Sequence, residues 1–189
     1  MRFSALLFTA LLLGAVLSAG ALAPPASAAA APARLYPALA DIRWNSDSGE
    51  PLSFDALKGQ IVVMTMGYSG CRKTCSTSVL VLKELQGLLD RLGKQAQFIV
   101  VTYDPAGDTP QAWKQYRQSR DLNRANWHFL SGTTDDTRRV ARMLDLNYWS
   151  YDEHIMHDFR IVIFDRDGRW HKEIVWQTQK DLDHLFDDL

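Results

Sequence analysis

The sequence has few cysteines, little net charge and no internal repeat. Two of its 189 residues are cysteine, and the formal net charge is −1, with short and scattered Lys/Arg clusters. A balanced surface of this kind does not indicate nucleic acid as a partner. No second linker is visible, and roughly 155 residues remain beyond the N-terminal segment, enough for one domain with a proper core. Six Trp, six Tyr and eight Phe support a dense core.

The two cysteines, Cys71 and Cys75, lie where a predicted strand passes into a predicted helix. Residues at this spacing share one helix face, so their sulfur atoms can meet as a disulfide or bind one soft metal ion. The helix N-terminus stabilises a thiolate, and Arg72 and Lys73 add positive charge. A structural disulfide is the alternative, although stabilising disulfides usually close longer loops. We therefore interpret the pair as a reactive site.

The N-terminus predicts export across a bacterial inner membrane. Arg2 precedes an apolar run over residues 6–17, and Ala26-Ser27-Ala28 is a signal-peptidase pattern. An uncleaved anchor over residues 4–23 is the alternative, and it would associate the chain with the inner membrane. In the periplasm, thiols must be metallated, oxidised or kept reduced by a partner. The predicted organisation is a signal peptide over 1–28, a flexible linker over 29–36 and a single folded domain over 37–189.

The order of the predicted elements is typical of an α/β fold. Strands and helices alternate from residue 61 onward, after an opening β-hairpin, so we expect a central mixed sheet with helices on both faces. With cysteines at the end of the first long strand, the fold class is thioredoxin-like. The predicted strands are 61–66, 97–103, 127–131, 159–164 and 169–175, with the hairpin at 41–54, and the predicted helices are 77–92, 110–119, 134–144 and 180–189.

His157 is the candidate third site residue. It precedes the strand 159–164, which in a thioredoxin-like sheet begins beside the cysteine-bearing helix end. Thioredoxins carry a cis-proline at that place, but no proline follows Pro110 in this chain. Two thiolates and one imidazole, from Cys71, Cys75 and His157, form a trigonal set that suits Cu(I), and Cu(II) can use it with an added ligand. A polar strand-edge residue is the alternative interpretation of His157.

The sequence resembles the Sco (SenC-type) copper proteins of cytochrome oxidase assembly, from about Pro37 to its end. The similar segments include Leu57-Lys58-Gly59-Gln60 and Gly67-Tyr68-Ser69-Gly70-Cys71. Residues 103–110 are similar to that family's Asp-Pro-x-x-Asp-Thr-Pro loop, and His157 stands where the family has its metal histidine. The resemblance implies a thioredoxin-like fold that binds one copper ion, as Cu(I) or Cu(II), through Cys71, Cys75 and His157.

The resemblance also implies a client, the binuclear copper site of an oxidase subunit, which would receive copper or reducing equivalents. The chain differs from the usual family pattern at Ser76, at Arg72-Lys73-Thr74 between the cysteines and at Asp158 after the histidine. Another copper enzyme therefore stays open as the client. The competing function is enzymatic: a thiol–disulfide reductase in which Cys71 and Cys75 keep the client's cysteines reduced.

Several neighbouring residues are weaker candidates. On a strand, His154 would face away from His157, and we expect Met156 to pack rather than bind metal. Met64 and Met66 alternate along a predicted strand, which favours core packing. Asp104 and Asp108 are expected to cap their own loop.

Overall fold

The centre of the fold is strand β3, which is buried along its whole length. It pairs in parallel with β4 and antiparallel with β8, so the sheet is mixed, as the sequence predicts. Among the described residues, the main sheet has seven strands in the order β2-β1-β5-β4-β3-β8-β9, and β6 and β7 form a separate hairpin. The strands are β1 Trp44–Ser46, β2 Pro51–Leu52, β3 Ile61–Gly67, β4 Ala96–Thr102, β5 Trp127–Ser131, β6 Tyr148–Tyr151, β7 His154–His157, β8 Arg160–Phe164 and β9 Trp170–Val175.

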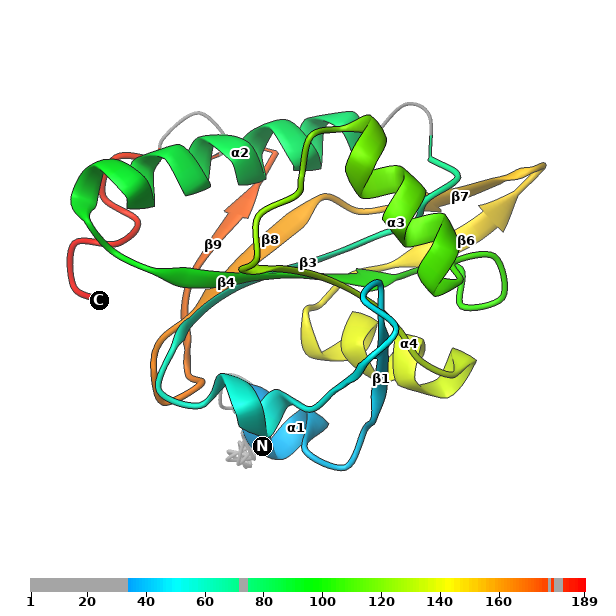
Figure 1. The fold of residues 1–189 in the computed structure, drawn as a ribbon, viewed down its shortest axis with the longest axis horizontal. Coiled ribbons are helices and arrows are strands. Elements are labelled where there is room, and N and C mark those ends of the chain that lie inside the picture. The colour runs from blue at the N-terminus through cyan, green and yellow to red at the C-terminus, as the bar shows by residue number, and fades with distance from the viewer. Residues whose placement is uncertain (1–33, 72–74, 177, 179–181) are drawn as a thin grey trace, which may run out of the picture. The chain divides into compact units, whose positions relative to one another are not determined.

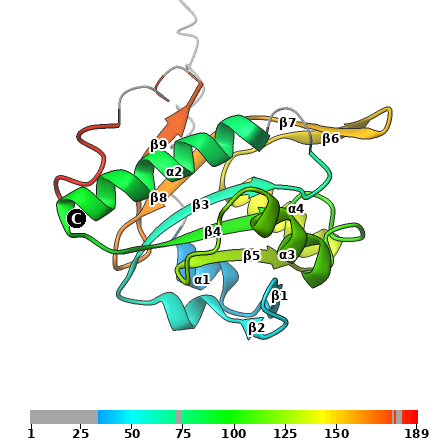
Figure 2. The ribbon, with the colours of Figure 1, turned by 45° about the horizontal axis from the view of Figure 1, so that its top comes forward.

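Helices cover both faces of this sheet in the computed structural model (Figure 1). α2 and α3 lie on one face, and α1 and α4 lie on the other (Figure 2). The helices are α1 Leu35–Leu39, α2 Cys75–Leu92, α3 Pro110–Ser119 and α4 Thr134–Met143, with a 3₁₀ turn at Phe54–Leu57. The structure describes residues 34–71, 75–176, 178 and 182–189, and for residues 75 and 76 it describes the backbone alone.

Alternation along the strands divides the core into two clusters. Ile61 and Val63 pack with the apolar side chains of α2 and α3, whereas Met64 and Met66 pack on the opposite face with those of α1 and α4. The two methionines are therefore core residues, as expected. Because this strand is buried on both faces, the run 61–66 is apolar at every position except Thr65, whose hydroxyl donates to the carbonyl of Arg160.

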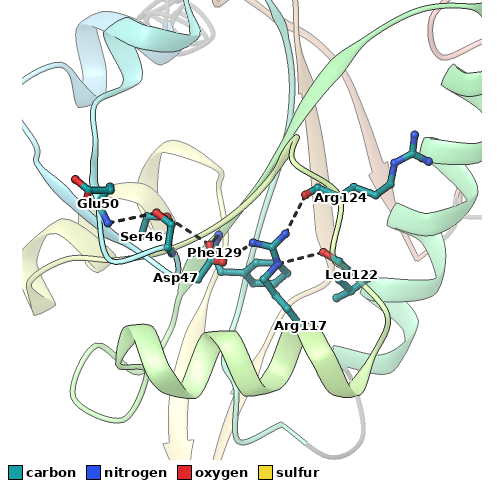
Figure 3. Close-up of polar contacts among 8 residues, drawn as sticks. Ser46, Asp47, Glu50, Arg117, Leu122, Arg124 and Phe129 are labelled. Carbon is teal, nitrogen blue, oxygen red and sulfur yellow. Dashed lines mark hydrogen bonds and ion pairs between the residues drawn. The ribbon is translucent and has the colours of Figure 1, made fainter.

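An ion pair ties α3 to the strands on its side of the sheet (Figure 3). The guanidinium of Arg117 contacts the buried carboxylate of Asp47, which also accepts a hydrogen bond from the backbone N–H of Phe129 at 3.0 Å. Arg117 further donates to the carbonyls of Leu122 at 3.1 Å and Arg124 at 2.9 Å. Each of the three guanidinium nitrogens thus donates a hydrogen bond, which helps to accommodate this charged pair beside the core.

The residues that precede α3 and α4 form the side-chain caps of these two helix N-termini. Thr109 caps α3, with Pro110 in its first turn, and its hydroxyl accepts a hydrogen bond from the N–H of Ala112 at 3.2 Å. Thr133 caps α4 in a reciprocal capping box with Asp136. These are the side-chain caps that helix N-termini require.

The predicted helix over residues 180–189 is wrong for its described part. Residues 182–189 form turns, in which Leu185 and Leu189 donate backbone hydrogen bonds to the carbonyls three residues before them. The carbonyls of His184 and Phe186 accept hydrogen bonds from Lys172 and Lys94. The described residues therefore make turn bonds and tertiary contacts where the sequence predicts a regular α-helix.

Two structural features, the β6–β7 hairpin and helix α1, are not predicted by the sequence. The hairpin occupies residues 148–157, between α4 and β8, where the sequence pattern indicates neither a strand nor a helix. Leu35 and Tyr36, at the end of the predicted linker, belong to α1 and are buried, and the Tyr36 hydroxyl donates to the carbonyl of Leu57 at 2.8 Å.

The predicted signal peptide, residues 1–28, lies outside the described residues, as do linker residues 29–33. In the part of the chain that the structure describes, no helix has both the length and the apolar character that crossing a membrane requires. Signal cleavage and periplasmic location therefore stay predictions.

Candidate metal centre

Three chain segments meet at the edge of the sheet beyond the carboxyl end of β3. β3 and β4 are parallel, so the residues that follow them, from Tyr68 and from Tyr103, leave the sheet on the same side. β8 runs antiparallel to β3 and begins at this edge with Arg160, whose carbonyl accepts a hydrogen bond from the Thr65 hydroxyl at 2.7 Å. Ligand sites of α/β sheets form at the carboxyl ends of the strands.

Cys71 lies at this edge and is 4% exposed. It belongs to the same buried cluster as Tyr68 and Tyr103. Its backbone is held on both sides: its N–H donates to the carbonyl of Tyr68 at 3.2 Å, and its carbonyl accepts from Arg120 at 3.3 Å. The guanidinium of Arg120 also lies over the ring of Tyr116, 3.9 Å from its centroid. The thiol therefore sits in a fixed and largely dry position.

Asp108 braces the segment that carries Cys71. Its side chain is 1% exposed, and its two carboxylate oxygens accept from the N–H of Ser69 at 2.8 Å and from the hydroxyl of Thr102. Burial raises the pKa of the Asp108 carboxyl above its ordinary value of 3.8, and the bonds from Ser69 and Thr102 oppose this rise. Asp108 was expected to cap its own loop, but it connects β4 to a segment 39 residues away.

His157 ends β7 and presents its ring to the same edge. The ring stacks on Tyr103 with centroids 4.6 Å apart and an interplanar angle of 24°. Its Nδ1 lies 2.8 Å from the carbonyl oxygen of Asp158. A carbonyl can only accept, so Nδ1 carries the proton and Nε2 carries the lone pair. This is the tautomer in which an imidazole binds a metal through Nε2.

β7 and the cysteine segment are in direct contact. The hydroxyl of Tyr68 accepts a hydrogen bond from the backbone N–H of Ile155 at 3.4 Å. Tyr103 stacks on His157, and its backbone N–H donates to the carbonyl of Gly67 at 2.7 Å, extending the pairing of the two parallel strands. The structure thus brings Cys71 and His157 to one edge through two tyrosines.

The second predicted thiol is described only by its backbone. Cys75 is the first residue of α2, as the position of the pair at a helix start predicts, but its side chain lies outside the described part, together with residues 72–74. Among the described side chains, no group of three His, Cys, Asp or Glu residues could hold a metal ion. The complete set of Cys71, Cys75 and His157 remains a prediction.

The weaker candidate site residues differ in solvent exposure and in contacts. His154 and Met156 alternate with half-buried Ile155 and His157 along β7 and are exposed, so His154 faces away from His157 as expected. Met156, expected to pack, is 43% exposed instead. Asp104 does cap its loop, because its Oδ1 accepts from the N–H of Gly107 at 3.0 Å.

Sequence analysis missed Tyr68, Tyr103 and Arg120 as residues that hold the site. Both tyrosines directly follow strands at their carboxyl ends, and that position is a usable signal for residues near a ligand site. Arg120 reaches Cys71 across 49 residues, and no local pattern indicates this contact.

Comparison with known proteins places this architecture in a family. The sequence model of the SCO1/SenC family matches residues 40–188. A protein of Stutzerimonas stutzeri whose name proposes copper binding is 28% identical over 137 residues, 69% of this chain and 66% of that protein. Matches to proteins of Bacillus subtilis and Rickettsia conorii with Sco names span 46% and 37% of those proteins. The chain thus spans two thirds or less of these relatives.

Solved structures share the fold. Bradyrhizobium japonicum ScoI with copper bound has a TM-score of 0.64 at 23% identity, covering 78% of this chain and 94% of that one. BsSco, a member of the Sco family of cytochrome c oxidase assembly proteins for which a disulfide switch is described, has a TM-score of 0.62 at 19% identity, covering 72% and 83%. The predicted thioredoxin-like fold class is confirmed, and the chain belongs to the SCO1/SenC family.

Proposed function

We propose that this protein is an exported copper chaperone, in which Cys71, Cys75 and His157 bind one copper ion as cargo. The orientation of His157 is the observation that carries the proposal. Its Nδ1–H donates to the Asp158 carbonyl and its ring stacks on Tyr103, which favours the neutral tautomer with the lone pair on Nε2. A dithiol reductase has no need of an imidazole held in this tautomer.

The donor set suits copper. Thiolate and neutral imidazole are ligands of Cu(I), and a tetragonal Cu(II) accepts the same set with one added ligand. The burial of Cys71 restricts water at the sulfur, and the start of α2 at Cys75 favours the thiolate form through the helix dipole. Copper would then pass in the periplasm to a client such as the binuclear copper site of an oxidase subunit, or to another copper enzyme.

Copper titration of the reduced protein tests the ligand set. Wild type is expected to bind one equivalent, and its Cu(II) form should show an intense sulfur-to-copper charge-transfer absorption. Cys71→Ser and Cys75→Ser should abolish binding, whereas His157→Ala should weaken Cu(II) binding most, because Cu(I) can persist on two thiolates. His184→Ala, at an exposed site near the C-terminus, is the matched control. Binding of both oxidation states by His157→Ala at wild-type affinity would exclude the proposed third ligand.

A thiol–disulfide reductase is the second candidate, and the pair of thiols at a strand-to-helix junction favours it. In that function, one thiolate attacks a client disulfide, and the second cysteine displaces the client thiolate from the mixed disulfide. Two mixing experiments separate the functions: Cu(I)-loaded protein with a reduced apo binuclear-copper domain, and reduced apo protein with the same domain oxidised. Copper transfer without rapid disulfide reduction supports the chaperone, and the reverse result supports the reductase.

A further inference from the structure

The β6–β7 hairpin has an outward face composed of soft and aromatic side chains. The strand register pairs Trp149 with Met156 and Tyr151 with His154, and both pairs project from the same side of the hairpin. Trp149 is 52% exposed, Tyr151 69% and Met156 43%, and His154 is also exposed. The alternate pairs, Tyr148 with His157 and Ser150 with Ile155, lie on the other side of the hairpin, and their members are half-buried except for the exposed Ser150. Both views show the hairpin at the same end of the fold as the start of α2 (Figures 1 and 2).

We propose that this outward face is a second, external binding site for a soft monovalent metal ion, Cu(I), with the imidazole of His154 and the thioether of Met156 as ligands. The two residues are separated by one position on the same strand, so their Cα atoms are about 7 Å apart and their side chains extend in parallel. Side chains of this length can converge on one ion between them. Imidazole and thioether together favour Cu(I) over Mg²⁺ or Ca²⁺, which prefer oxygen ligands.

The aromatic neighbours complete the environment of such an ion. Trp149 lies directly opposite Met156, where cross-strand Cβ atoms are about 5 Å apart, so its ring can lie against the thioether and the bound cation. Sulfur–aromatic and cation–π contacts are both favourable. The turn between the strands carries the exposed carboxylates Asp152 and Glu153, which add negative potential beside the site. Among the described residues, three of the six exposed large hydrophobic side chains, Trp149, Tyr151 and Met156, gather on this one small hairpin.

The external site lies next to His157 in sequence, so it could pass copper to the internal site. Met156 and His157 are adjacent on β7, and their side chains point to opposite faces of one strand. An ion held by Met156 therefore needs to pass only around the strand to reach His157. This relay rests on the proposed function, because it requires the internal site formed by Cys71, Cys75 and His157, whereas binding at the external site does not.

Silver(I) is the probe, because it has the ligand preferences of Cu(I) and does not change oxidation state. It is titrated in chloride-free buffer into wild type and into Cys71→Ser/Cys75→Ser/His157→Ala, which lacks the internal site. We expect two equivalents for wild type and one for the triple variant. Binding to the triple variant should quench Trp fluorescence, and Trp149→Phe in that background should remove the quenching and leave one equivalent bound.

Adding His154→Ala and Met156→Leu to the triple variant should abolish silver binding, whereas adding His184→Ala should not. Circular dichroism of each variant verifies that the fold is retained. If the triple variant binds no silver, or binds it equally after His154→Ala and Met156→Leu, the external site is refuted. Failure of the internal site gives a different result, because wild type and the triple variant would then bind the same amount.

Discussion

Asp108 offers the sharpest test of how the fold holds the cysteine segment. Asp108→Ala removes the acceptors of the Thr102 hydroxyl, which is fully buried, and of the Ser69 N–H, which is half-buried. A buried donor left without a partner costs about 1–3 kcal/mol. We assign this full cost to the Thr102 hydroxyl, because it is fully buried, and about half of it to the Ser69 N–H, because it is half-buried. We therefore expect Asp108→Ala to lower the free energy of unfolding by about 1.5–4.5 kcal/mol.

Asp108→Asn separates the hydrogen bonds from the charge. The amide keeps one oxygen for Ser69, but its NH₂ group cannot accept, so the Thr102 O–H loses its acceptor even if the NH₂ donates to the hydroxyl oxygen. The Thr102 hydroxyl loses its acceptor while the Ser69 bond and the side-chain shape are kept, so the expected cost is about 1–3 kcal/mol and smaller than that of Asp108→Ala. If Asp108 braces the segment through its hydrogen bonds, Asp108→Asn should lower the free energy of unfolding less than Asp108→Ala does.

The raised pKa of Asp108 adds a pH dependence of defined sign. Because burial raises the folded-state pKa above the ordinary 3.8, the folded protein binds more protons than the unfolded chain between these two values. The contribution of this carboxyl to stability is thus greatest below pH 3.8 and is lost as the pH rises through the folded-state value. The difference in unfolding free energy between wild type and Asp108→Asn should fall over that interval and then level off.

Urea unfolding of the reduced, metal-free proteins across this pH interval measures both effects, with Asp104→Asn as a control on the same loop. The midpoint and slope of each transition give the free energy of unfolding. Asp108→Ala within about 0.5 kcal/mol of wild type would refute the bracing role. A pH profile of Asp108→Asn that parallels wild type would refute the effect of the buried carboxyl.

Three further predictions follow from particular contacts. Arg117→Leu leaves the buried carboxylate of Asp47 without its cation and should lower the free energy of unfolding by about 3 kcal/mol in urea, and an unchanged midpoint would contradict the ion pair in Figure 3. Thr133→Ala removes the cap of α4 and should cost about 1 kcal/mol by thermal unfolding, an effect that Thr133→Ser should largely avoid. Tyr103→Leu removes the ring that stacks on His157 and should weaken Cu(II) binding about 10-fold with little change for Cu(I); equal losses for both ions would indicate general damage to the site.

Much of the fold could be predicted because its signals are local. The apolar run 61–66 and the Thr109-Pro110 helix start are properties of adjacent residues, and they correspond to β3 and α3. The predicted helix over 180–189 is absent from its described part, where residues 182–189 form turns and two carbonyls bond to lysines 12 and 92 residues away in sequence. The β6–β7 hairpin was missed because its outward face carries Trp149, Tyr151 and Met156 rather than polar residues, so the segment shows no hydrophobic–polar alternation.

By itself, the sequence determined which residue types form the candidate site and beside which strand or helix end each of them lies. Cys71 follows a buried strand, Cys75 begins a helix, and His157 precedes another strand, all of which depend on neighbours along the chain. Only the tertiary structure decided what orients them: the ring of Tyr103 against His157 and the carboxylate of Asp108 beneath the cysteine segment. These contacts join residues 54 and 39 positions apart. Such pairs are selected by sheet register and packing, and no local propensity encodes them.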